Sequence, residues 1–246
     1  MKYLWLPILV ALLLPPALSR AGDDLQAGIA AYTAGDFQAA RRLLAPLAAG
    51  GNAEAQFVLG KAYYFGEGDE QDYATAIGRF TDAARQGHAS AAGFLGYMAE
   101  LGIGTPKDRQ KALCLYIDAA RRGHADSQWN LAMLYLNLRS MERHRYWLDR
   151  AVRQGQEDAL EWLAGVWLLN PLEFDKTKAY LYLMVAARKG HKAAAERLRQ
   201  IRKSPSFVAV EQLARAEQDL ARWAEEVDVP PAKLTPISDD CYPPAR

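Results

Sequence analysis

Five glycines recur along this chain at nearly constant spacing, and this period constrains the fold more than any other feature. Their separations are 36, 36, 32 and 35 residues, and they are Gly51, Gly87, Gly123, Gly155 and Gly190. A period of this length is typical of a supersecondary unit that is copied along a chain. The chain is therefore expected to build its core by stacking similar units rather than by closing a single globule.

A mostly apolar pattern precedes each of these glycines. Its positions lie eleven, seven and four residues before the glycine, which places them on one face of a helix. The members are Ala40, Leu44 and Leu47; Ala76, Phe80 and Ala83; Ala112, Tyr116 and Ala119; His144, Leu148 and Ala151; and Ala179, Leu183 and Ala186. Each set predicts the buried stripe of one helix.

The two ends of these helices are also marked in the sequence. Fifteen residues before each glycine stands a residue whose side-chain oxygen can cap a helix: Asp36, Asp72, Asp108, Ser140 and Asp175. Such an oxygen accepts a hydrogen bond from an amide of the first helical turn. The glycine can adopt the left-handed conformation that ends a helix. The capping residue, the apolar stripe and the glycine therefore predict the same single helix in each unit.

A second helix is predicted after each glycine. Its apolar positions are Ala55, Leu59 and Tyr63; Ala91, Leu95 and Ala99; Ser127, Leu131 and Tyr135; Ala159, Leu163 and Trp167; and, more weakly, Ala194 and Leu198. In the first four sets the leucine is followed by a small residue: Gly60, Gly96, Ala132 or Ala164. Glycine inside a helix costs about 1 kcal/mol relative to alanine, so its reuse indicates that a neighbouring helix packs closely there.

A short helix pair cannot bury its own apolar face, but a stack of such pairs can. The pattern therefore predicts an all-α solenoid of about five helix pairs over residues 22–203. After the break at Ser204-Pro205, residues 204–228 keep a helical apolar spacing interrupted by Glu217 and are predicted to form a capping helix. Residues 229–246 contain five prolines and are predicted to form an irregular tail.

Residues 1–21 have the layout of a secretory signal peptide. Lys2 precedes an apolar run that ends at Pro15 and Pro16, and small residues surround Arg20. The run is shorter than the roughly 20 residues that span a bilayer, although an uncleaved membrane anchor is the alternative. No later stretch has the length and apolar character of a membrane span. The sequence thus predicts a periplasmic or secreted protein.

The charge balance argues against nucleic acid as a ligand. Removal of Lys2 and Arg20 leaves 28 basic residues against 29 acidic ones, so the net charge changes from +1 to −1. Binding to nucleic acid phosphates requires a clustered positive surface.

In an oxidising compartment the two cysteines, Cys114 and Cys241, can form a disulfide; two unpaired cysteines are the equal alternative.

No catalytic or metal-binding constellation stands out. His88, His124 and His191 each follow a repeat glycine. Equivalent positions on packed helices lie about 10 Å apart, too far to share one metal, so these histidines are interpreted as turn residues. His144 occupies a helix position that is alanine in other units, and Cys114 lies on a packed helix. We therefore expect no enzyme activity, no metal and no cofactor.

The combination Leu59-Gly60, Gly66-Glu67-Gly68, Asp72, Ala83-Ala84 and Gly87 resembles the Sel1-like repeat, a relative of the tetratricopeptide repeat. The next unit matches as well, through Leu95-Gly96, Gly102-Ile103-Gly104, Asp108, Ala119-Ala120 and Gly123. The unit over residues 125–155 lacks the glycine turn and is four residues shorter, and Asn170-Pro171 replaces that turn in the unit over 157–190.

This resemblance implies a right-handed superhelical α-solenoid that binds proteins. It suggests a non-catalytic adaptor or scaffold of the bacterial cell envelope, in a Gram-negative bacterium. The alternative of the same binding class is a periplasmic immunity protein that neutralises an antibacterial effector, such as a phospholipase delivered by type VI secretion. A hydrolase that acquired the repeat is a third hypothesis, for which the sequence supplies no residue set.

The resemblance to tetratricopeptide grooves also suggests which residues bind the partner. The lining positions lie two before, two after and five after the repeating leucine. They are Phe57, Lys61 and Tyr64; Gly93, Tyr97 and Glu100; Trp129, Met133 and Leu136; and Glu161, Gly165 and Leu168. The strongest candidates are Phe57, Lys61, Tyr64, Tyr97, Glu100, Trp129, Met133 and Glu161. Aromatic residues and methionine are enriched in interface cores, but some of these rings are equally expected to pack between helices.

Overall fold

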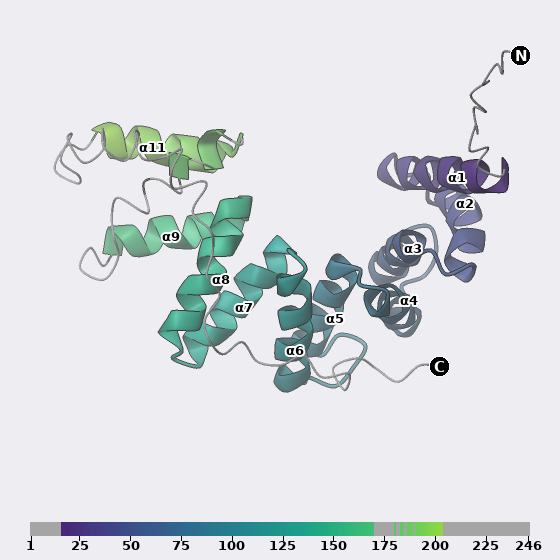
Figure 1. Cartoon of the computed structure of the whole chain (residues 1–246), viewed down its shortest axis with the longest axis horizontal. Helices are drawn as coiled ribbons and strands as arrows, with labels where there is room; N and C mark the ends of the chain where they lie inside the picture. Colours follow the sequence, from purple (N-terminus) through teal and green to yellow (C-terminus); the bar gives the residue numbers. More distant parts are fainter. Residues whose placement is uncertain (1–15, 170–179, 181–182, 185, 189, 204–246) are drawn as a thin grey trace, which may run out of the picture. The chain divides into compact units, whose positions relative to one another are not determined.

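The computed structural model describes residues 16–169, 180, 183–184, 186–188 and 190–203, and every regular element among them is an α-helix (Figure 1). This confirms the predicted all-α fold. The helices are α1 (Pro16–Thr33), α2 (Phe37–Ala49), α3 (Ala53–Phe65), α4 (Tyr73–Arg85), α5 (Ala89–Leu101), α6 (Arg109–Arg121), α7 (Ala125–Asn137), α8 (Met141–Gln154), α9 (Glu157–Leu169) and α11 (Lys192–Lys203). The predicted capping helix and tail lie outside the described residues, as do residues 1–15.

The chain divides into two compact units, Met1–Gln86 and Gly87–Arg246. In the first unit α2 packs on α1 and α3, and α4 packs on α3. In the second unit the order of packing is α5 on α6, α6 on α7, α7 on α8, α8 on α9, and α9 on α11. Within each compact unit, helices therefore pack on the described helices next to them along the chain, as consecutive helix pairs of a repeat protein do.

We call α3, α5, α7, α9 and α11, each of which follows a repeat glycine, the A helices, and α2, α4, α6 and α8 the B helices. The predicted stripes form the core of each unit. On the B helices, Leu44, Phe80, Tyr116 and Leu148 are buried at the equivalent position. On the A helices, the repeating leucines 59, 95, 131, 163 and 198 are buried. The period of the sequence thus corresponds to one A and B helix pair.

The four predicted capping residues that the structure describes all occupy N-cap positions, and three of them form the predicted hydrogen bond. Asp36, Asp72 and Asp108 each accept a hydrogen bond of 3.0 Å from the amide three residues later. Ser140 occupies the N-cap position of α8, but its side chain makes no capping hydrogen bond. Asp175 lies outside the described residues.

The backbone of the repeat glycines explains the constancy of this position. All five have a φ between 85° and 94°, in the left-handed region that penalises a side chain. The shortened turn before α8 has no glycine, and there Arg139 adopts a φ of 54°. Arg139 is the one non-glycine residue with positive φ in the described part of the chain.

The small residue after the repeating leucine allows close helix packing, as predicted. A Cβ at Gly60 would lie 2.7 Å from the ring of Phe80, and a Cβ at Gly96 would lie 2.8 Å from the ring of Tyr116. Both contacts join an A helix to the B helix of the same pair. Glycine at these positions lets the large B-helix ring occupy the space of a side chain.

Helix α1 and Cys114 are the described parts of the predicted signal region and of the predicted disulfide. Helix α1 begins at Pro16 and continues across the predicted cleavage point after Ala21. Over the residues described, no helix combines the length and apolar character needed to cross a bilayer. Cys114 is disulfide-bonded; its pairing with Cys241 stays a prediction, because Cys241 lies outside the described residues.

Candidate functional site

The predicted groove residues all lie on A helices, and in the first unit they form a packed cluster. The half-buried ring of Phe57 lies 5.9 Å from the ring of Phe80, and the ring of Tyr64 lies 6.5 Å from it. The Lys61 ammonium lies over the ring of Tyr32, 4.7 Å from its centroid. These rings contribute to the packing of α1, α3 and α4, and part of their surface faces solvent.

In the second unit, Tyr97 and Glu100 lie three residues apart on α5. Tyr97 is 42% exposed and is among the exposed large hydrophobic residues of the described chain. Glu100 is half-buried and accepts a hydrogen bond of 2.9 Å from the hydroxyl of Tyr116. Burial is the main cause that raises the pKa of Tyr116, and the carboxylate of Glu100 adds to it. Glu100 therefore serves the core as well as the surface.

Trp129 forms a ring pair with a residue that the sequence prediction missed. Its ring lies 6.3 Å from the ring of Trp162 on α9, with an interplanar angle of 61°. Trp162 also contacts the buried ring of His144, and the two ring centroids lie 4.9 Å apart. Trp129, Trp162 and Met133 are half-buried. A surface of partly exposed rings and a flexible thioether is typical of a protein interface.

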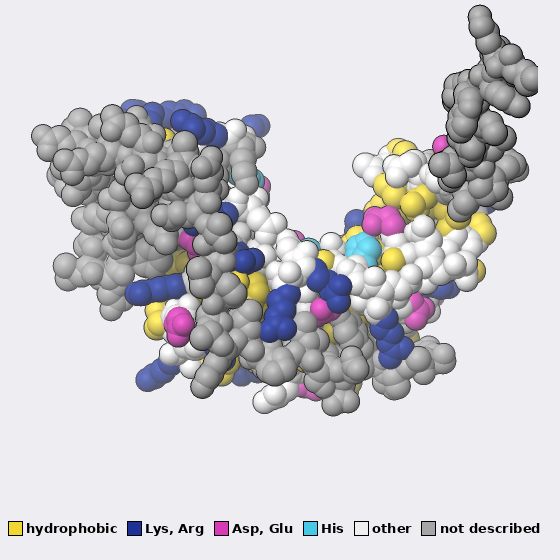
Figure 2. Space-filling view, viewed as in Figure 1, with side chains coloured by type: hydrophobic (Ala, Val, Ile, Leu, Met, Phe, Trp, Pro, Cys, Tyr) yellow, Lys and Arg dark blue, Asp and Glu magenta, His cyan; other side chains and the backbone are white. Residues whose placement is uncertain are grey.

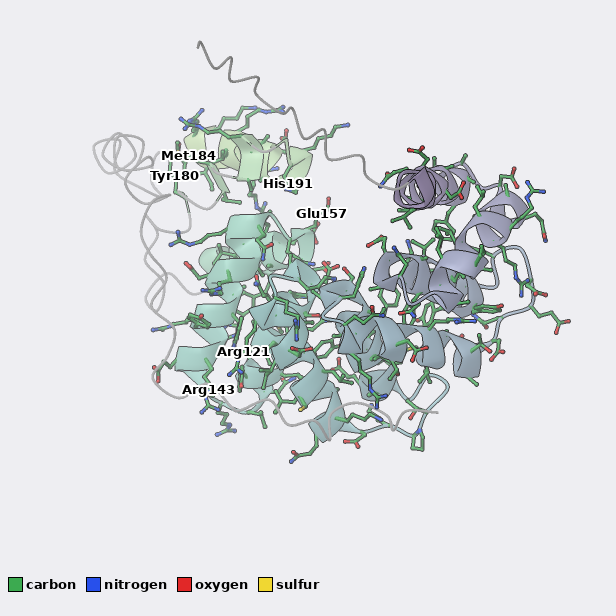
Figure 3. All side chains as sticks on the ribbon, turned by 45° about the vertical axis from the view of Figure 1, so that its right-hand side comes forward. Arg121, Arg143, Glu157, Tyr180, Met184 and His191 are labelled. Atoms are coloured by element: carbon green, nitrogen blue, oxygen red, sulfur yellow. The ribbon has the colours of Figure 1, made fainter. Side chains whose placement is uncertain are left out.

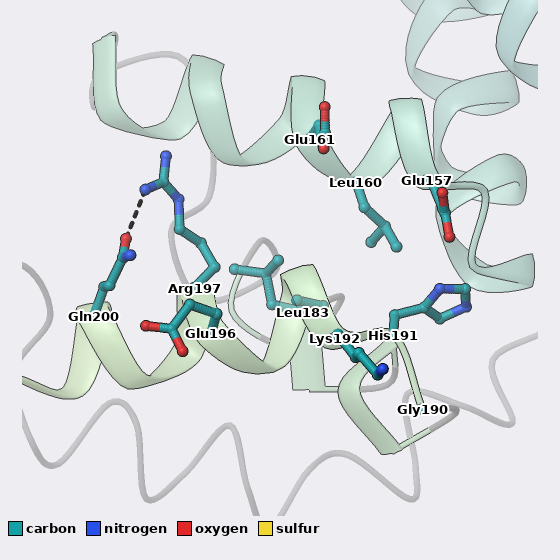
Figure 4. A pocket seen from close by; sticks show the side chains of 11 residues that line it. Glu157, Leu160, Glu161, Leu183, Gly190, His191, Lys192, Glu196, Arg197 and Gln200 are labelled. Atoms are coloured by element: carbon teal, nitrogen blue, oxygen red, sulfur yellow. Dashed lines mark hydrogen bonds between the residues drawn. The ribbon is translucent and has the colours of Figure 1, made fainter.

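A cavity of about 830 Å³ lies between α9 and α11 (Figure 4). Its apolar part consists of Leu160, Leu183 and Ala194, of which the two leucines point into the space between the helices. Glu157 stands at one end, where its side chain points toward the ring of His191 (Figures 3 and 4). The remaining lining residues are Glu161, Gly190, Lys192, Glu196, Arg197 and Gln200.

The cavity extends the predicted groove by one unit. The offsets of two before and two after the repeating leucine, applied to Leu198, give Glu196 and Gln200, and both line the cavity. Glu161, the candidate from the preceding unit, lines the opposite side. Gly165 and Leu168 belong to the end of α9 where side chains are not described.

The histidines have structural surroundings. His88 and His124 are the N-caps of α5 and α7, and their Nδ1 atoms accept from the amides of Ala91 and Ser127. This agrees with their interpretation as turn residues. The Nδ1 of His144 lies 2.9 Å from the carbonyl oxygen of Ala132, which can only accept, so Nδ1 carries the proton. Burial lowers the pKa of His144.

The Nδ1 atoms of His88, His124 and His144 are engaged in the fold, the first two as helix caps and the third as a donor to a main-chain carbonyl. Within the described ranges, no group of three His, Cys, Asp or Glu side chains has the geometry to hold a metal ion. Among the described residues, the predicted groove positions and the cavity present rings, apolar side chains and charges.

Comparison with known proteins agrees with this architecture. Residues 53–88, 89–124 and 125–164 match the Sel1 repeat. The chain is similar to the protective antigen c5321 of uropathogenic Escherichia coli, which displays an SLR fold, with 28% identity and a TM-score of 0.63. That match covers 84% of this chain and 46% of the antigen, so this chain spans less than half of the antigen's length.

A second solved structure resembles the chain over most of both lengths. It is a Sel1 repeat protein from Oxalobacter formigenes, with 23% identity, a TM-score of 0.66, and coverage of 86% of this chain and 91% of that one. At this identity the likeness concerns the fold alone. No functionally curated protein matches the chain significantly.

Proposed function

Because this chain is a Sel1 repeat protein over residues 53–164, and Sel1 repeats generally mediate protein–protein interactions, we propose that it is an adaptor that binds a protein partner in the bacterial cell envelope. Repeat proteins of this kind are typically non-catalytic scaffolds, and we assign this chain to that class. The partner binds the exposed face of the A helices.

The observation that carries the proposal is the ring pair of Trp129 and Trp162 on consecutive A helices. Together with the exposed Tyr97 on α5, it gives the second unit an aromatic surface at the predicted groove positions. Tryptophan and tyrosine are the residue types that most often dominate the binding energy of protein interfaces.

The location in the envelope rests on the signal-like layout of residues 1–21. Cleavage after Ala21 would remove the first six residues of α1, so the mature chain would start within that helix. N-terminal sequencing of the protein recovered from a periplasmic fraction tests this point. Recovery of an intact Met1 from the membrane fraction would favour the uncleaved anchor instead.

Affinity capture tests the binding function. The mature chain is immobilised, exposed to periplasmic extract of the source organism, and the retained proteins are identified by mass spectrometry. We expect one partner to be retained by the unchanged chain and by Gln110→Ala, a change at an exposed position on α6. Tyr97→Ala and Trp129→Ala should each reduce retention severalfold, as loss of an interface aromatic does.

Thermal melting of the same variants separates a binding role from a core role. Because Tyr97 is exposed, Tyr97→Ala should keep the melting temperature of the unchanged chain. The proposal would be contradicted if, in both variants, the lost retention were accompanied by a corresponding fall in melting temperature. If the retained protein is a toxic enzyme, and deletion of this chain sensitises cells to their sister cells, the adaptor is specifically an immunity protein.

A further inference from the structure

The cavity between α9 and α11 has walls of opposite charge. On the α9 side, Glu157 and Glu161 are exposed, and neither makes an ion pair with the part of the chain that the structure describes. On the α11 side, Lys192 is exposed and Arg197 is half-buried. Lys and Arg side chains also gather along α11 in the space-filling view, at the upper left of Figure 2.

The charges on the α11 side are not neutralised within that wall. Glu196 is already paired with Arg199, since their side-chain atoms lie 2.9 Å apart. Arg197 donates one hydrogen bond of 2.7 Å to the amide oxygen of Gln200, which carries no charge. A guanidinium has five N–H donors, so Arg197 keeps donors that can bind a carboxylate.

The floor between these walls is apolar. Leu160, Leu183 and Ala194 contribute to it, and each belongs to a different segment of the chain. The size of the cavity is within the range of sites that enclose a ligand group, and an apolar floor gains free energy when a hydrophobic side chain displaces water. An occupant that uses the whole cavity therefore has an apolar centre, a positive side and a negative side.

We propose that this cavity binds a segment of the partner protein in which an apolar side chain lies between a basic and an acidic residue. The apolar side chain contacts Leu160 and Leu183, the basic residue faces Glu157 and Glu161, and the acidic residue faces Lys192 and Arg197. This inference rests on the proposed function, because it assigns a sequence character to the polypeptide that the A helices bind. A polypeptide fits because Glu161, Glu196 and Gln200 continue the groove positions of the preceding A helices.

The test uses the full mature chain and fluorescein-labelled synthetic peptides in a Gly-Ser background. Two bipolar probes carry Lys, Leu and Asp in the two possible orders. Three control probes replace Lys, Leu or Asp by Ser. Binding is followed by fluorescence anisotropy up to about 1 mM, the range of weak peptide contacts. We expect at least one bipolar probe to bind about threefold more tightly than the controls without Lys or without Asp, which is the effect of one exposed ion pair. It should also bind more tightly than the control without Leu, because that probe loses the contact with the apolar floor.

Substitutions in the two charged walls test whether the probes bind in this cavity. Glu161→Gln should weaken binding of the bipolar probe about threefold and leave binding of the probe without Lys unchanged. Arg197→Gln should also weaken binding of the bipolar probe about threefold, but it should leave binding of the probe without Asp unchanged. Glu142→Gln, at an exposed position of α8, is the matched control and should leave all probes unchanged. Glu161→Lys should reverse the preference, so that a probe with Asp on both sides of Leu binds more tightly than the bipolar one.

Two results would overturn the inference: bipolar probes that bind no better than their controls, or binding that ignores Glu161 and Arg197. Circular dichroism of each variant shows that the helices are retained. If the cavity variants capture the partner as well as the unchanged chain while Tyr97→Ala does not, the cavity inference fails and the proposed function stands. If the unchanged chain captures no partner at all, the proposed function itself fails.

Discussion

The ring of Tyr116 lies against Gly96 so closely that a Cβ at position 96 would stand 2.8 Å from two of its carbons. Tyr116 is fully buried, and its hydroxyl donates to the carboxylate of Glu100 at 2.9 Å. The ring therefore cannot turn away from position 96 without breaking a partly buried hydrogen bond. This contact fixes α5 against α6 and holds Glu100 at the predicted binding face.

Replacement of Gly96 by alanine is expected to destabilise the protein. The added methyl group overpacks a dense contact, a change that typically costs about 1–3 kcal/mol and exceeds the gain in helix propensity. The midpoint of urea unfolding, followed by circular dichroism, measures the effect. Gly78→Ala is the matched control, since position 78 is inside α4 and no atom of the described chain lies within 4 Å of a Cβ there. That variant should be about 1 kcal/mol more stable. A stabilised Gly96→Ala would show that the Tyr116 ring moves freely.

The helix caps give a second pair of opposed expectations. Asp108→Ala removes the side-chain hydrogen bond to the amide of Lys111 and should cost about 1 kcal/mol. Ser140→Ala changes a residue at the equivalent position that makes no such bond, and should cost close to nothing. Thermal melting of both variants checks this contrast. Similar losses from both would mean that Ser140 does cap α8 in solution.

Much of the fold was predictable from the sequence because its determinants are local. The left-handed glycines, the Asp caps and the buried stripes each depend on a few residues within one helix and its ends. The prediction failed at Ser140, where residue type suggested a cap. There the shortened turn places Arg139 in the left-handed region, and Ser140 has a φ of −94° and a ψ of 78° without a capping bond.

Less of the candidate site was predictable, because its contacts join helices far apart in sequence. The offsets from the repeating leucine identified Trp129, but its partner Trp162 lies at a position that is Asn130 in the preceding unit. Partners of this kind are set by how A helices pack. Similarly, no local pattern revealed that the buried Gln128 donates to the carbonyl of Ala120 and accepts from Gln154.

The left-handed backbone at Arg139 predicts that glycine would be preferred there. A residue with a Cβ pays roughly 1–2 kcal/mol in this conformation, and glycine avoids that cost. Arg139→Gly should therefore raise the free energy of unfolding by about 1 kcal/mol, once the greater freedom of glycine in the unfolded chain is subtracted. Arg139→Ala keeps the Cβ and should leave stability unchanged. Equal stability of the two variants would contradict a strained turn.

The buried ring of His144 predicts a loss of stability in mild acid. Burial lowers its pKa below the ordinary value of 6.5, and its Nε2 has no hydrogen-bond partner among the residues that the structure describes. As the pH falls through 6.5, the unfolded chain takes up a proton before the folded chain does, so unfolding becomes more favourable. Above that pH both states are neutral and the ring contributes no pH dependence. At about pH 5.5 the loss amounts to at most about 1.4 kcal/mol for one histidine.

Urea unfolding at about pH 7.5 and 5.5 measures this loss in the unchanged chain and in two variants. His144→Ala introduces the residue of the equivalent positions 40, 76 and 112, so its unfolding free energy should fall less between the two pH values. Burial also lowers the pKa of His124, and this residue can be replaced without loss of the helix cap. His124→Asn supplies the cap that Asn52 provides for α3 and should likewise reduce the pH dependence. Parallel pH profiles for the unchanged chain and His144→Ala would mean that the folded protein accommodates a charged ring at position 144. The reason is that stability changes with pH only where a pKa differs between the folded and unfolded states.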